Sequence, residues 1–177
     1  MTVRISKPAF NLRDKLSTLD YSRVPYEKMP TGSIIQVKYT HIPATGSQGY
    51  NSNSTGYNDT GHDVLISPRF SSSKVLVSVG VQIFATSSAQ HSYVGIVRDD
   101  DNGSGNHAGT LFHSSTLWES SGPGQANHIS FSYLDSPQTT SEVKYSIYIK
   151  SDNSGNTVYI NGSSYSDCYI MAQEVKQ

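Results

Sequence analysis

Six histidines are the side chains in this chain with the most evident capacity for metal binding or acid–base catalysis. No two of them form an H-x-H or H-x3-H pair, the short spacings that bring two imidazoles to one ion. We therefore predict no metal site and no cofactor, and interpret the histidines as strand and turn residues. A homotrimer could still gather one histidine per subunit around an ion on its axis. The six are His41, His62, His91, His107, His113 and His128.

A run of acidic residues at 99–105, with the sequence DDDNGSG, is superficially similar to a calcium-binding loop. Read from Asp100, it has oxygen-bearing side chains at the early ligand positions. Position twelve, however, is Leu111, where an EF-hand requires a bidentate Glu. A solvated hairpin loop therefore explains these residues better than a calcium site.

Motifs that would indicate an enzyme are absent from the sequence. It contains no G-x-S-x-G nucleophile elbow, no G-x4-G-K-[ST] phosphate loop and no G-x-G-x-x-G after a strand. After Glu27 the only glutamates are Glu119, Glu142 and Glu174, so paired carboxylates for glycoside hydrolysis are hard to assemble. We predict no catalytic residues and a non-enzymatic protein.

The composition narrows the remaining function classes. Only 15% of the 177 residues are charged, and the formal net charge is -1, which argues against a nucleic-acid-binding domain. No apolar run approaches the ~20 residues that span a bilayer. The N-terminal ten residues lack a signal-peptide pattern, so we expect synthesis in a reducing cytoplasm and no membrane insertion. The single cysteine, Cys168, excludes an intramolecular disulfide and is expected to be buried and inert.

Apolar residues alternate with polar ones through most of the chain after residue 31, which is the pattern of half-buried antiparallel strands. The clearest examples are residues 74–83, where Val75 to Ile83 place every second side chain on one face, and residues 142–150. Turn-forming Asn-Gly and Asp-Asn sequences separate the strands. We predict an all-β antiparallel sandwich of jelly-roll type over residues 31–177. Its expected strands are 33–41, 62–67, 74–83, 92–98, 110–118, 128–134, 142–150, 157–161 and 166–174.

Residues 1–30 differ in character and are predicted to form an extended or short-helical N-terminal arm. They carry six Lys or Arg against three acids, a net charge of +3, whereas the other 147 residues carry seven against eleven. Leu12, Leu16 and Leu19 lie at i, i+4 and i+7, on one stripe of a short helix that is marginal alone in water. The stripe either packs on its own domain or docks on a neighbouring protein. The predicted docking residues are Phe10, Leu12, Arg13, Lys15, Leu16 and Leu19.

Aromatic side chains in or near polar loops are the remaining candidates for contact with a ligand. Tyrosine and histidine among Ser and Asn make adaptable contact surfaces for sugars or proteins. The candidate receptor or sugar contacts are Tyr50, Tyr57, His107 and His113.

Two stretches of the sequence carry a resemblance to a known group. Residues 5–20, ISKPAFNLRDKLSTLD, are similar to the N-terminal segment of small virion proteins of marine and freshwater phages, notably cyanophages. Residues 129–141, ISFSYLDSPQTTS, resemble the β-rich distal domain of the same group. The loops 47–61 and 99–109 match no pattern of the group, so the resemblance implies nothing about receptor preference there.

The resemblance implies a virion component, and it leaves three roles open. The first is a trimeric short tail fibre or receptor-binding appendage, attached to a tail or baseplate protein through the arm and contacting a host surface glycan. The second is a capsid decoration (cement) protein on the head lattice. The third stands apart from the resemblance and is a free carbohydrate-binding, lectin-like module unconnected to virions. A sandwich poor in charge suits the homotrimer, because hydroxyl and aromatic surfaces can be buried between subunits without stranding charges.

Overall fold

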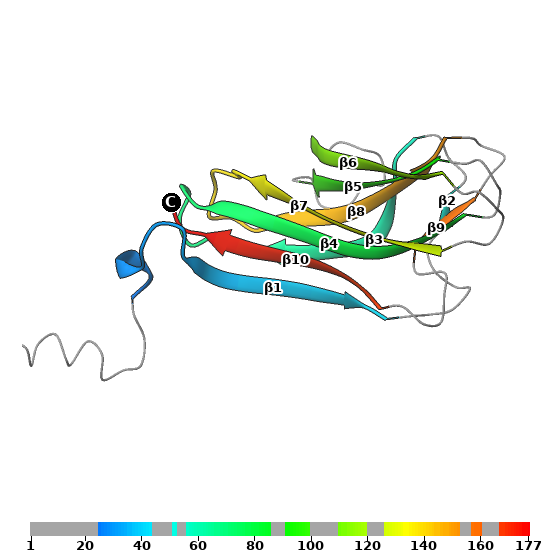
Figure 1. The fold of residues 1–177 in the computed structure, drawn as a ribbon. Helices are drawn as coiled ribbons and strands as arrows, with labels where there is room; N and C mark the ends of the chain where they lie inside the picture. Colours follow the sequence, from blue (N-terminus) through cyan, green and yellow to red (C-terminus); the bar gives the residue numbers. More distant parts are fainter. Residues whose placement is uncertain are drawn as a thin grey trace, which may run out of the picture.

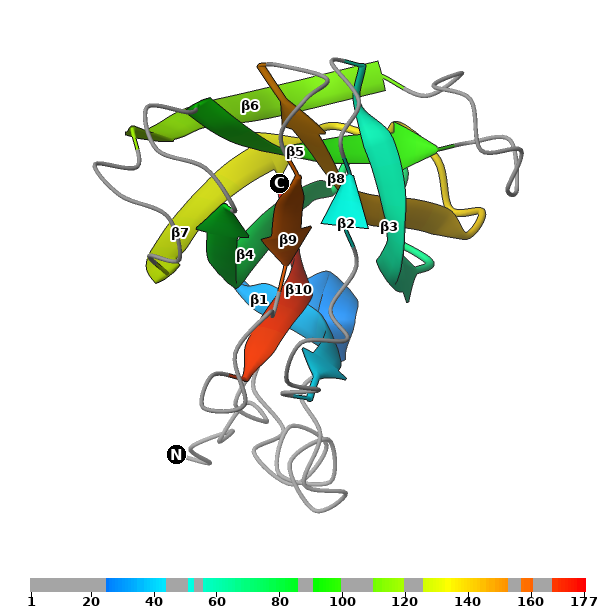
Figure 2. The ribbon, with the colours of Figure 1, turned by 90° about the vertical axis from the view of Figure 1, so that its right-hand side faces the viewer.

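The computed structural model describes residues 25–43, 51–52, 56–85, 91–99, 110–119, 126–152, 157–160 and 167–177. Antiparallel strands form two sheets that pack face to face, as Figure 2 shows in a view along the strands. The elements are η1 (Tyr26–Lys28), β1 (Ile34–Ile42), β2 (Asn51–Ser52), β3 (Asn58–Ile66), β4 (Lys74–Ala85), β5 (His91–Asp99), β6 (Thr110–Glu119), β7 (Ala126–Asp135), β8 (Val143–Ser151), β9 (Val158–Ile160) and β10 (Cys168–Val175).

The strand order is that of a jelly roll. One sheet, here the neutral sheet, has β10 between β1 and β4, and β7 on the other side of β4. Short strands β2 and β9 pair with each other and extend the β1 and β10 positions of this sheet. The second sheet, here the charged sheet, has the order β3-β8-β5-β6. Two four-stranded layers connected in this order make the eight-stranded double Greek key of a jelly roll, as predicted.

The core lies between the two sheets and uses the inward faces that the alternation indicated. On β4, Val75, Val77, Val79, Val81 and Ile83 are all at most 1% exposed. Val143, Tyr145, Ile147 and Ile149 of β8 face them from the other sheet and are equally buried. Burial of such side chains contributes about 1.5–3 kcal/mol each and is the main source of the sandwich's stability. All nine predicted strands are present.

Two features of the strands depart from simple alternation. β3 begins at Asn58, earlier than predicted. A bulge between Asp59 and Asp63 interrupts its pairing with β8, so the first part of the strand does not continue the alternation of the second part. Gly61 sits in this bulge at φ +72°, and the Asp59 carboxylate accepts a hydrogen bond from its N–H. β8 is buried on both faces at its centre, since the outward Ser146 and Tyr148 are 0% and 2% exposed.

One end of the sandwich carries both the N-terminal segment and the C-terminus (Figure 1). Pro30 to Ser33 form a turn that Gly32 closes at φ +88°, and Gly32 then pairs with the backbone of Lys176. The β3–β4 and β7–β8 connections lie at this same end. The C-terminal ends of β4, β6 and β8 and the starts of β5, β7 and β9 lie at the opposite end.

Candidate functional site

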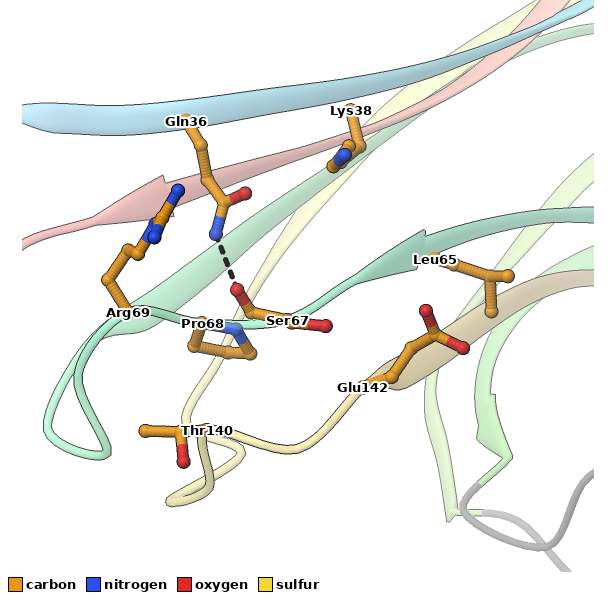
Figure 3. A pocket seen from close by; sticks show the side chains of 8 residues that line it. All are labelled: Gln36, Lys38, Leu65, Ser67, Pro68, Arg69, Thr140 and Glu142. Atoms are coloured by element: carbon orange, nitrogen blue, oxygen red, sulfur yellow. Dashed lines mark hydrogen bonds between the residues drawn. The ribbon is translucent and has the colours of Figure 1, made fainter.

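A pocket lies between the two sheets, on the side where β1 faces the end of β3. It has a volume of about 580 Å³. Gln36 and Lys38 reach it from the inner side of β1, because their partners Glu174 and Ala172 on β10 face inward. The remaining lining residues come from β3, the β3–β4 turn and the β7–β8 connection: Leu65, Ser67, Pro68, Arg69, Thr140 and Glu142 (Figure 3).

The fully buried carboxylate of Glu174 connects the segments that line this pocket through hydrogen bonds. It accepts hydrogen bonds from the backbone N–H of Arg69 at 2.7 Å and of Phe70 at 3.3 Å. The Gln36 amide donates to the same carboxylate at 2.7 Å and to the carbonyl of Ser67 at 2.6 Å. β1, β10 and the crossover between the sheets are thereby held in one network, which fixes the shape of the pocket wall.

Opposite charges face each other across the pocket without forming an ion pair. Lys38 extends from β1 on one wall and Glu142 from the start of the β8 segment on the other (Figure 3). Neither side chain takes part in an ion pair with a described residue. The Thr140 hydroxyl and the partly exposed Leu65 lie beside Glu142. Donors, acceptors and an apolar surface are therefore available to one small polar ligand.

Behind the pocket, the N-terminal segment is anchored to the end of the sandwich by two cations. The ammonium of Lys176 donates to the carbonyls of Tyr26, Glu27 and Met29 at 3.0, 2.6 and 2.7 Å. The guanidinium of Arg69 lies 5.2 Å from the centre of the Tyr26 ring, which is a cation–π contact. Residues 25–30, the last part of the expected arm, are thus fixed to the domain.

Tyr57 is the predicted contact residue that the structure describes in full. Its ring lies 4.8 Å from the ammonium of Lys150, which also lies 4.4 Å from the ring of Tyr93. Neither Lys150 nor Tyr93 was predicted from the sequence as a contact residue, although Tyr93 directly opposes Lys150 in the β5–β8 register. Lys150 is the last residue but one of β8 and Tyr93 is the third residue of β5, so this aromatic pair around a lysine lies on the outer face of the charged sheet, where β8 ends and β5 begins.

Most other predicted residues cannot be placed. His113 lies on β6 opposite Ile96. Tyr50, His107 and the six docking residues from Phe10 to Leu19 lie outside the described residues.

Burial shifts the pKa of two ionisable groups among the described residues, His62 and Cys168. Burial lowers the pKa of His62 against the opposing effect of Asp59 and Asp63. Burial raises the pKa of the Cys168 thiol, whose sulfur accepts the backbone N–H of Gln82 at 3.2 Å. In the parts of the chain that the structure describes, no cluster of three His, Cys, Asp or Glu side chains could hold a metal ion. Those same parts contain no helix with the length and apolarity needed to cross a membrane.

The fold and these surfaces define the chain as a jelly-roll β-sandwich. No protein-family model matches it, and no curated protein sequence matches it. Among solved structures it is similar to VP2 of infectious bursal disease virus, at 12% identity and a TM-score of 0.44. That match covers 86% of this chain and 40% of VP2, so the chain spans well under half of the viral protein.

Carbohydrate-binding modules are also among the similar structures. The CBM6 module of lichenase 5A from Cellvibrio mixtus, solved with cellotriose, is 11% identical with a TM-score of 0.34, and the match covers 82% of this chain and 99% of that one. The CBM22-1–GH10 modules of xylanase 10B from Clostridium thermocellum are 14% identical with a TM-score of 0.38, over 83% of this chain and 26% of that one. Likenesses at this level carry no functional assignment.

Proposed function

We propose that this chain is a non-enzymatic structural protein of a bacteriophage virion, a homotrimer attached through its N-terminal arm and acting as a short tail fibre or receptor-binding appendage. It would be made in the host cytoplasm and carried on the particle. The observation that carries the proposal is that the two ends of the sandwich differ. Residues 25–30 are held at one end by Lys176, whereas the C-terminal ends of β4, β6 and β8 lie at the other end. An attachment point and a displayed surface are thereby separated by the length of the strands.

The arm's composition fits attachment to another virion protein, whether of the tail, the baseplate or the capsid. Its leucine stripe would supply the affinity, and its basic side chains would set the encounter rate and orientation on an acidic surface. Capsid decoration uses the same architecture and is the rival role. Copy number per particle separates the two, because a tail appendage follows the low symmetry of the tail and a cement protein follows the head lattice.

Deletion of residues 1–20 tests the attachment. We expect a folded, soluble oligomer that no longer joins the particle, measured by circular dichroism and by mass spectrometry of purified virions. Leu16→Asp should have the same effect, and Ser17→Asp, one position off the leucine stripe, is the matched control that should still be incorporated. Unfolding of the truncated protein, or normal incorporation of the Leu16 variant, would show that the arm is not a docking device.

Binding of a host surface glycan is a second candidate function, and the pocket between the sheets favours it. Sugar hydroxyls both donate and accept, so one ring could accept from Lys38 and donate to Glu142 while its C–H face rests on Leu65. A glycan array probed with the full chain tests this, followed by Lys38→Ala. The matched control is Lys74→Ala, outside the pocket. Equal glycan binding by both variants would exclude the pocket.

A further inference from the structure

The outer face of the neutral sheet is free of charge across its central part. The strand registers align three rows of four outward side chains over β1, β10, β4 and β7. None of these positions holds Asp, Glu, Lys or Arg. The rows are Val37, Gln173, Leu76 and Leu134; Tyr39, Met171, Ser78 and Ser132; and His41, Tyr169, Gly80 and Ser130.

Several apolar side chains on this face are exposed to solvent. Val37 is 51%, Tyr39 58% and Leu134 46% exposed. Val37 and Tyr39 lie on β1 and Leu134 lies on β7, and exposed apolar side chains gathered on one face are a feature of interaction sites. The outer face of the charged sheet differs sharply: Lys144 pairs with Asp63 at 3.3 Å, and Lys150 lies between two tyrosine rings. These charged groups lie on the other sheet, whereas at one margin of the neutral face His41 lies 3.2 Å from the carboxylate of Asp167.

The neutral face has two halves of different shape. Over β1 and β10 the side chains are bulky, and the rings of Tyr39 and Tyr169 lie nearly parallel with centres 6.0 Å apart. Over β4 and β7 the first row holds Leu76 and Leu134, whereas the other two rows hold small residues, and the hydroxyls of Ser78 and Ser132 bond to each other at 2.7 Å. The Tyr169 ring leans over Gly80, where an added Cβ would collide with it. The rings of Tyr39 and Tyr169 therefore form a raised strip, here the tyrosine ridge. It runs beside a strip of small residues, here the serine–glycine lane, formed by Ser78, Gly80, Ser130 and Ser132.

We infer that this face is the subunit interface of the protein, and that its occupant is a second copy of the same chain. The inference rests on the homotrimer of the proposed function and names the surface that forms it. The tyrosine ridge of one copy lies in the serine–glycine lane of the next. Such a contact is heterologous, since it joins two different patches, and it closes into a ring when three copies meet. The neutral surfaces are buried with no charge to desolvate.

Charge argues for a second copy over the chain's own arm. Residues 1–24 hold five Lys or Arg and two acids. The carboxylate that borders these rows is that of Asp167, which already lies 3.2 Å from His41. Most of the five cations would therefore lose their hydration on this face without compensation. Another neutral face has no such cost. The hydroxyls of Ser130 and the tyrosines can pair across the interface, because each can donate as well as accept.

The test is the oligomeric mass of the full chain, by multi-angle light scattering over a range of micromolar concentrations. The wild type is expected to be trimeric. Tyr39→Arg is expected to reduce the mass threefold, to the monomer, by placing a charge on the ridge. Ser132→Trp fills the lane without a charge and should have the same result. Leu65→Arg, at a side chain 43% exposed on the charged sheet, is the matched control that stays trimeric.

The outcomes separate this inference from the proposed function. A trimeric wild type whose Tyr39 and Ser132 variants fold, by circular dichroism, and remain trimeric would overturn the interface and leave the trimer standing. A wild type that is monomeric throughout would overturn both, and a dimer would overturn the head-to-tail ring. Loss of the trimer on deletion of residues 1–20, with the Tyr39 variant still trimeric, would assign the contact to the arm.

Discussion

The Glu174 carboxylate accepts three hydrogen bonds at a fully buried position, and two of its donors are backbone N–H groups of the β3–β4 turn. Glu174→Ala would remove the acceptor of both N–H groups, whose hydrogen bonds are part-buried. A hydrogen bond to a charged group contributes about 1.5–3 kcal/mol, so we expect the free energy of unfolding to fall by about 2–4 kcal/mol. Urea unfolding followed by circular dichroism measures it. Glu142→Ala, at an exposed carboxylate, should change stability by less than about 0.5 kcal/mol, and an equal loss in both variants would contradict this role.

His62 gives the protein a pH dependence with a defined sign. Its folded-state pKa lies below the ordinary value of 6.5, chiefly because of burial. The unfolded chain therefore takes up a proton first, and stability is lost as the pH falls below 6.5 through the folded pKa. We expect the melting temperature of the wild type to drop more between about pH 7.5 and about pH 5.5 than that of His62→Asn. Identical drops in the two proteins would show that His62 does not contribute.

Single residues differ in how far the sequence could predict them. Cys168 was predicted to be buried and is buried. It occupies an inward position of β10, along which buried and partly exposed side chains alternate. Glu174 could not be foreseen as a core residue. Its partners Arg69 and Gln36 are 105 and 138 positions away, and only the folded topology brings their N–H groups to it.

At the scale of elements, alternation predicted the long strands and failed where the backbone leaves regular geometry. The two-residue strand β2 is too short to show a period, and it lies within a stretch that was expected to be a polar loop. The bulge of β3 shifts the phase of the pattern, so that only its second half was recognised. β8 was expected to be half-buried. A central strand flanked by Asp59 on one side and the side-chain-free Gly95 on the other can also bury its outer Tyr148.

The hydrogen bonds from Lys176 hold η1 against the sandwich, and their loss is expected to expose this segment to proteolysis. Lys176 satisfies three carbonyls at the end of a single helical turn, an element too short to persist alone. Lys176→Met removes all three bonds, and a local loss of about 1 kcal/mol would make tryptic cleavage after Lys28 roughly fivefold faster, because cleavage follows the open population. Mass spectrometry of the fragments measures the rate. Lys38→Met, which removes a cation from β1, is the control and should leave it unchanged.

For the molecule as a whole, alternation identified the inward face of each strand but not the order of the strands. Order depends on pairings such as β4 with β10, which join the first half of the chain to its last residues. The jelly roll was predicted from the number and spacing of strands, and the particular layering came from the structure. The neutral face escaped notice for the same reason: its twelve positions belong to four strands that become neighbours only after folding.

The separation of charge across the molecule predicts that the two proposed associations, trimer formation and attachment through the arm, respond differently to salt. The arm carries +3 over residues 1–30, whereas the proposed subunit interface carries no formal charge in its three rows. Raising NaCl from about 0.1 M to about 0.5 M shortens the screening length to a few ångströms. The trimer mass should then stay constant, because apolar burial is not screened, while rebinding of the protein to particles that lack it should weaken. Light scattering measures the first and co-sedimentation with particles the second. Dissociation of the trimer by salt would show that charged residues outside the neutral face hold the subunits together.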